Sequence, residues 1–109
     1  MVLIFRIFQD LKNYRQEFKA EGKSANNVIG VLLGKTKPDE FVVFSAHYDH
    51  LGMKTNGKGK DTIYNGANDD ASGVTAVIEL ANYFKKLNQN ERTIIFVSFT
   101  GEETGGFGS

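Results

Sequence analysis

Three short polar clusters in this 109-residue chain contain the side chains that could bind a metal ion or move a proton. The clusters read HYDH at residues 47–50, NDD at residues 68–70 and EE at residues 102–103. Imidazole and carboxylate groups are zinc ligands, and they are also common general acids and bases. The chain has no cysteine, so nitrogen and oxygen atoms alone would hold any bound metal.

The HYDH cluster has an ordinary explanation as well as a chemical one. A histidine at the end of a strand can simply belong to a hydrogen-bonded turn. However, Asp49 follows His47 by two residues, and its carboxylate could accept the second ring N–H and fix the tautomer. That arrangement is the usual support for a metal-bound imidazole. HYDH alone leaves the two interpretations open.

The two acidic clusters can be interpreted in the same two ways. Acidic residues before a helix are common caps, but capping needs only one of Asp69 and Asp70, so the other can point elsewhere. The glutamates could form a solvated turn among glycines. Because neighbouring side chains at the end of a strand point in different directions, Glu102 and Glu103 could instead divide metal binding and proton transfer.

Three apolar runs and one amphipathic segment are predicted to position the clusters. Residues 29–33, 41–46 and 93–99 are rich in β-branched and aromatic side chains, and their near-continuous hydrophobicity is typical of strands covered on both faces. Residues 71–87 are predicted to be helical, with one apolar stripe formed by Val74, Val77, Ile78, Ala81 and Phe84. A strand, a helix and a strand in this order predict a crossover onto a parallel sheet.

Each cluster stands where a predicted strand ends or where the predicted helix begins. HYDH follows the second strand, NDD precedes the helix, and EE follows the third strand. Ligands of open α/β sheets bind outside the carboxyl ends of the strands, so we expect the three clusters to meet at one edge. This convergence is stronger evidence for a site than any single cluster.

The rest of the chain indicates one globular domain of ordinary composition. Thirteen basic residues balance thirteen acidic ones, which argues against nucleic acid or an anionic membrane as the main partner. No apolar run approaches the roughly 20 residues of a membrane helix, and no signal peptide is predicted. Residues 52–66 are predicted to form a long polar loop. The first twenty residues fit a helix or a strand, and the β-rich residues 2–8 favour the strand.

In combination, the clusters resemble the zinc aminopeptidases of peptidase family M28. The segments that match are SAHYDHLG at 45–52, NGANDDASG at 65–73 and RTIIFVSFTGEETGGFGS at 92–109. The family blocks read approximately AHxDH, GAxDxxSG and FxxxxGEExGLxGS, and the resemblance extends over residues 26–109. Gly106 departs from the pattern, because family members usually have leucine there.

The resemblance implies an α/β fold, part of a three-layer α/β/α sandwich with a mixed, mainly parallel sheet. It implies two zinc ions in each complete site, with Asp69 bridging the pair, His47 binding one ion and Glu103 binding the other. Glu102 would be the general base, and Asp49 would orient His47. The substrate would be a peptide or protein, cleaved at its amino terminus.

The resemblance also implies that residues 1–109 are the N-terminal portion of a catalytic domain. The family has two further ligands, an Asp and a His, downstream of the GEE block, and His50 does not stand at either position. We therefore expect the chain alone to be incomplete and inactive, with the last strand an open apolar edge and the missing C-terminal part as a partner. Family members often have a cis peptide after the bridging Asp, here between Asp69 and Asp70.

Three other functions compete with peptide hydrolysis. The same scaffold serves one-zinc acyl transferases such as glutaminyl cyclases, and a non-catalytic relative could retain the fold without the metals. A plain α/β binding module without metal is the third. Ligand-type residues are retained at His47, Asp69 and Glu103, which argues against a decayed relative.

Overall fold

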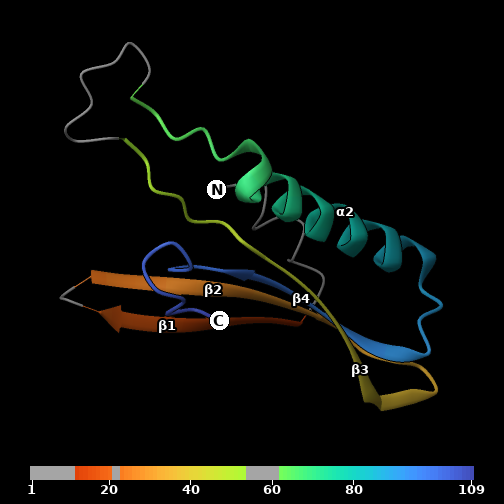
Figure 1. The fold of residues 1–109 in the computed structure, drawn as a ribbon. Helices are drawn as coiled ribbons and strands as arrows, with labels where there is room; N and C mark the ends of the chain where they lie inside the picture. Colours follow the sequence, from red (N-terminus) through yellow and green to blue (C-terminus); the bar gives the residue numbers. More distant parts are fainter. Residues whose placement is uncertain (1–11, 21–22, 54–61) are drawn as a thin grey trace.

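The computed structural model describes residues 12–20, 23–53 and 62–109, which form a four-stranded sheet with a helix packed on one face (Figure 1). Its elements are β1 (Lys12–Ala20), β2 (Lys23–Leu32), β3 (Lys37–His47), a short turn η2 (Ala67–Ala71), α2 (Ser72–Leu87) and β4 (Arg92–Phe99). The predicted strands and helix are all present. β1 confirms the preference for a strand near the start, whereas residues 2–8 lie outside the described residues.

The sheet is mixed, as predicted, and its strands lie in the order β1-β2-β4-β3. β3 and β4 are parallel, and α2 connects them, which confirms the predicted strand–helix–strand unit. β2 pairs antiparallel with both β1 and β4. Parallel pairing in the described part of the sheet is therefore confined to the two strands that end at the polar clusters.

The expectation that the last strand forms an open edge is wrong, because β4 lies between β2 and β3. The connection from β2 to β3 must therefore pass close over the start of β4. Gly34 makes this approach, and a Cβ atom there would lie 2.5 Å from the Glu91 carbonyl oxygen. Thr93 secures the crossing, since its hydroxyl accepts from the Gly34 N–H at 3.0 Å and donates to the Pro38 carbonyl at 2.8 Å.

The core lies between α2 and the sheet and contains aliphatic side chains and one aromatic ring: Ala46, Val77, Ala81, Ile94 and Phe96. The ring of Phe44 is stacked with those of Phe84 and Phe96, with centroid distances of 6.0 and 5.9 Å. Val77 and Ala81 belong to the predicted apolar stripe, so the helical spacing identified the buried face of α2 correctly. No helix within the described residues has both the length and the apolar character needed to cross a membrane.

The prediction that residues 41–46 are covered on both faces is wrong in the described structure. Ala46 faces the core, but Phe41 and Val43 are 62% and 56% exposed. Alternate residues of a strand point to opposite faces, and only the α2 face of β3 is covered by described residues. Near-continuous hydrophobicity indicated a strand correctly but could not indicate which of its faces the described residues cover.

Candidate metal centre

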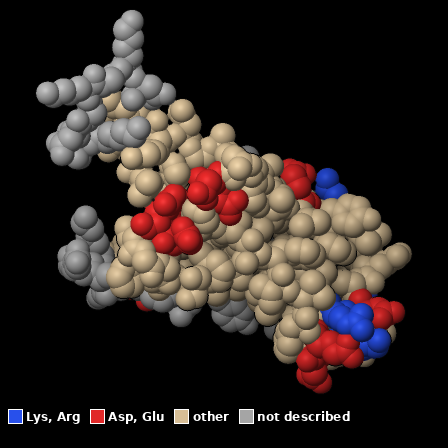
Figure 2. Space-filling view, viewed as in Figure 1, with Lys and Arg blue, Asp and Glu red and all other residues tan. Residues whose placement is uncertain are grey.

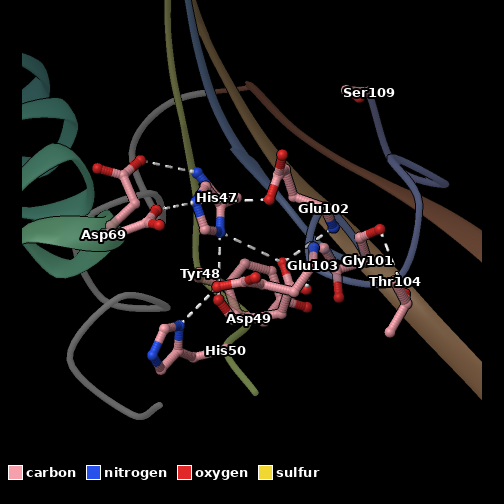
Figure 3. Close-up of polar contacts among 12 residues, drawn as sticks. His47, Tyr48, Asp49, His50, Asp69, Gly101, Glu102, Glu103, Thr104 and Ser109 are labelled. Atoms are coloured by element: carbon pink, nitrogen blue, oxygen red, sulfur yellow. Dashed lines mark hydrogen bonds and ion pairs between the residues drawn. The ribbon is translucent and has the colours of Figure 1, made fainter. Parts of the chain in front are cut away.

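The segments that contain the three polar clusters meet at one end of the sheet, beside the start of α2 (Figure 1). His47 is the last residue of β3 and is in register with Phe99, the last residue of β4. Because these strands are parallel, the turn after β4 that contains Glu102 lies next to His47, while η2 brings Asp69 from the side of the helix. Figure 3 shows the His47 ring between Asp69 and Glu102.

Short distances join the side chains at this end of the sheet. His47 Nε2 lies 2.9 Å from Asp69 Oδ1 and 3.9 Å from Glu102 Oε2. One ligand atom from each of His47, Asp69 and Glu103 can be chosen so that all three lie within 4.8 Å of one another. One imidazole nitrogen and two carboxylates so close together fit a divalent cation with nitrogen and oxygen ligands. The predicted convergence is therefore present, while the role of each residue as a ligand stays a prediction.

Asp69 and Asp70 divide two tasks between them. The peptide bond that joins them is cis, as the resemblance implied, and the backbone of both residues lies outside the helical region. Asp70 accepts from the Gly73 N–H at 3.1 Å, which caps the start of α2, and from the His47 N–H at 3.2 Å. Asp69 points to the His47 ring instead. The acidic pair thus caps the helix with one carboxylate and leaves the other for the site.

Asp49 holds the turn after β4 more directly than it orients His47. Its carboxylate accepts from the backbone N–H groups of Glu102 and Glu103, each at 3.2 Å. For His47 Nδ1 the nearer acceptor is the Asp49 backbone carbonyl at 3.2 Å, whereas the Asp49 carboxylate is 3.7 Å away. Asp49 therefore contacts the imidazole through its main chain and joins the two segments through its side chain.

A buried asparagine ties the same turn to β2. Asn27 is 1% exposed, and its side chain accepts from the Thr100 N–H at 3.0 Å and donates to the Gly108 carbonyl at 2.6 Å. Both ends of the turn that contains the two glutamates are thereby fixed to the interior of the sheet. Sequence reasoning assigned Asn27 no role, because its partners are more than 70 residues away.

Glu102 and Glu103 occupy different surroundings, as expected for neighbours after a strand. The Glu102 side chain is 51% exposed and faces the open side of the site, whereas the Glu103 side chain is 16% exposed. Glu103 Oε1 lies 2.7 Å from Nδ1 of His50. Sequence reasoning set His50 aside. The signal that could have identified it is a second histidine three positions after the first.

The site is strongly acidic around its central imidazole. Figure 2 shows acidic side chains gathered near the start of α2, with no Lys or Arg among them in this view of the described residues. Partial burial lowers the pKa of His47. The hydrogen bonds to Asp69 and to the Asp49 carbonyl, together with the charges of Glu102 and Asp70, outweigh that effect and raise the pKa of His47 above its ordinary value. A divalent cation would relieve the same concentration of negative charge.

Comparisons with known sequences agree with these observations. The sequence matches Peptidase family M28 over residues 27–109. A probable zinc metalloprotease of Pyricularia oryzae is 40% identical over 84 residues, and one of Pyrenophora tritici-repentis is 37% identical over 84 residues. Each alignment covers 77% of this chain, and the chain spans only 16% and 17% of the length of these relatives.

Solved structures resemble the described fold. A glutaminyl cyclase of Fimbriiglobus ruber superposes with a TM-score of 0.73 and 25% identity, covering 94% of this chain and 36% of that one. A leucine aminopeptidase precursor of Bacteroides thetaiotaomicron superposes with a TM-score of 0.65 and 26% identity, covering 86% of this chain and 34% of that one. These matches confirm the predicted α/β fold class, and this chain spans about a third of the length of each solved chain.

Proposed function

This chain belongs to peptidase family M28, and we propose that it contributes the metal-binding and proton-transfer residues of a zinc-dependent aminopeptidase. The observation that supports the proposal most strongly is the approach of ligand atoms from His47, Asp69 and Glu103 to within 4.8 Å of one another. In the proposal, Asp69 would bridge two zinc ions, His47 would bind one and Glu103 would bind the other. A donor set of nitrogen and oxygen without sulfur is typical of catalytic zinc rather than structural zinc.

The residues around the proposed ligands have distinct tasks. Bound zinc would supply a Lewis acid that polarises the scissile carbonyl and lowers the pKa of water. The Glu102 carboxylate, which is exposed and 3.9 Å from the imidazole, accepts the proton of the attacking water and passes it to the leaving amine. The Asp49 carboxylate holds Glu102 in place by accepting from the Glu102 backbone N–H. The Asp70 carboxylate accepts from the backbone N–H of His47 in the same way.

The proposal concerns a whole protein of the length of the curated relatives. These relatives are about six times as long as the stretch that they share with this chain. We expect a protein of that length containing these residues to hydrolyse leucine p-nitroanilide, to lose activity with a chelator and to regain it with zinc. The N-acetylated substrate should not be cleaved, because an aminopeptidase needs a free amino terminus. Cyclisation of N-terminal glutaminyl peptides without hydrolysis would support acyl transfer instead, and activity that survives complete removal of zinc would contradict both.

Zinc affinity is expected to fall as the pH is lowered through the pKa of His47, because only the neutral imidazole binds metal. The pKa of His47 is raised, so the proton begins to compete at a higher pH than for an ordinary histidine. Below that pKa, protonation of His47 alone should lower the zinc affinity about tenfold for each unit by which the pH falls. Zinc titrations with a competing chelator between pH 5.5 and 8.5 would measure this, and an affinity that is constant across the range would exclude His47 as a ligand.

A further inference from the structure

We propose that His50 is a positioning residue for Glu103, fixing the orientation of its carboxylate so that one oxygen stays available for the cation. This inference rests on the proposed function, since it treats Glu103 as a metal ligand. The contact that supports it is the 2.7 Å distance between His50 Nδ1 and Glu103 Oε1. A carboxylate has no proton to give, so Nδ1 is the donor and Oε1 the acceptor.

The surroundings of His50 hold its ring in the orientation that this hydrogen bond needs. The ring of Tyr64 meets the His50 ring edge-on, with centroids 6.2 Å apart and planes at 85°. Gly66 lies on another side with a φ of +65°, and a Cβ atom there would be 2.8 Å from His50 Cδ2. Glycine is therefore needed at position 66 both for its backbone conformation and for the space that the imidazole occupies.

Two neighbouring residues thus hold Glu103 at both of its ends. Asp49 Oδ2 accepts from the Glu103 backbone N–H at 3.2 Å, and His50 donates to the carboxylate of the same residue. Since Oε1 already accepts from His50, we expect Oε2 to be the oxygen that binds a metal ion. Both side chains of the His50–Glu103 pair are partly buried, so solvent competes less for this hydrogen bond than for one on the surface.

The inference predicts a specific pattern of zinc affinities among variants of the whole protein that contains these residues. Losing a partner that orients a metal ligand typically weakens metal binding about 10–100-fold, so we expect a loss of this size in His50→Leu. In His50→Asn the side-chain amide can place an N–H donor near the position of Nδ1, and it should recover most of the affinity. Titration of zinc against a chromophoric chelator measures both, and circular dichroism checks that each variant is folded.

A spectroscopic measurement separates positioning from a general loss of stability. With Co²⁺ in place of zinc, we expect the visible absorption bands of the chain to change in His50→Leu and to return towards the original in His50→Asn. Tyr48→Phe is the matched control, because it removes a side-chain hydrogen bond of the same segment, from Tyr48 Oη to the Asn26 carbonyl, without touching a proposed ligand. Its zinc affinity and Co²⁺ spectrum should stay unchanged.

The outcomes distinguish the inference from the proposed function. Two results would overturn the role of His50 without affecting the proposed metal site. One is a zinc affinity of His50→Leu within about threefold of the unsubstituted protein. The other is a zinc affinity of His50→Asn no higher than that of His50→Leu. If the Leu variant is unfolded, the Asn variant and its Co²⁺ spectrum decide the matter by the same criterion. If the unsubstituted whole protein binds no zinc, the proposed metal site and the inference are both overturned.

Discussion

Replacing Glu102 by glutamine is expected to lower the rate of peptide hydrolysis about 10²–10⁴-fold while the zinc content stays the same. The substitution preserves the shape of the side chain but removes the carboxylate that would take the proton from the attacking water. Glu102 is half exposed and is not among the three residues that could share a cation, so metal binding should not depend on it. Steady-state kinetics on an aminoacyl anilide, together with metal analysis of the same samples, measures both quantities.

The adjacent glutamate is the matched control for this prediction. Glu103→Gln makes the same chemical change one residue further along, at a side chain that contacts His50 and that we propose as a ligand. It should lower zinc affinity, and activity should then fall because metal is lost. If Glu102→Gln retained activity within a few-fold, or if it lost zinc to the same extent as Glu103→Gln, the roles assigned to the two glutamates would be wrong.

Replacing Asp69 by alanine is expected to weaken zinc binding by more than the roughly 10–100-fold that follows from losing an outer hydrogen-bond partner. Asp69 is the proposed bridge between the two ions, so its removal would affect both. Its side chain is 74% exposed, and its one described contact is with the His47 ring, so the stability of the fold should change little. Zinc titration and thermal unfolding of the metal-free chain measure the two effects separately.

The neighbouring substitution Asp70→Ala should show the opposite pattern. Asp70 accepts from the Gly73 N–H at the start of α2, and loss of such a cap costs about 0.5–2 kcal/mol of unfolding free energy. Its effect on zinc should be smaller than that of Asp69→Ala, because its hydrogen bond to His47 is with the backbone N–H and not with the imidazole ring. Equal losses of zinc affinity in the two variants would contradict the division of tasks between these carboxylates.

Local patterns in the sequence were sufficient to predict much of the fold. The spacing of Val77 and Ala81 identified the buried face of α2, and the apolar run at 93–99 identified β4 almost to its ends. The order of strand, helix and strand predicted the parallel pair and therefore the meeting of His47, Asp69 and Glu103 at one end of the sheet. These features depend on residues close in sequence or on general rules of chain connection, which a single sequence contains.

Other features depend on contacts between distant segments, and the sequence could not supply them. Whether Phe41 is covered depends on what packs on the face of the sheet opposite α2, and the described residues leave Phe41 62% exposed there. The sequence did not indicate which of the two carboxylates, Asp69 or Asp70, caps the helix. The backbone of η2 decides this, because it directs Asp70 to Gly73 and Asp69 to His47.

The sequence by itself determined which chemical groups are present and that they follow neighbouring strand ends, because residue type and hydrophobic periodicity are local properties. Only the tertiary structure decided what each group contacts. It showed that the Asp49 carboxylate binds the turn after β4 rather than the His47 ring, and that His50 meets Glu103. The physical reason is that a hydrogen bond between residues more than 50 positions apart depends on side-chain direction, which is set by the packing of the whole sheet and helix.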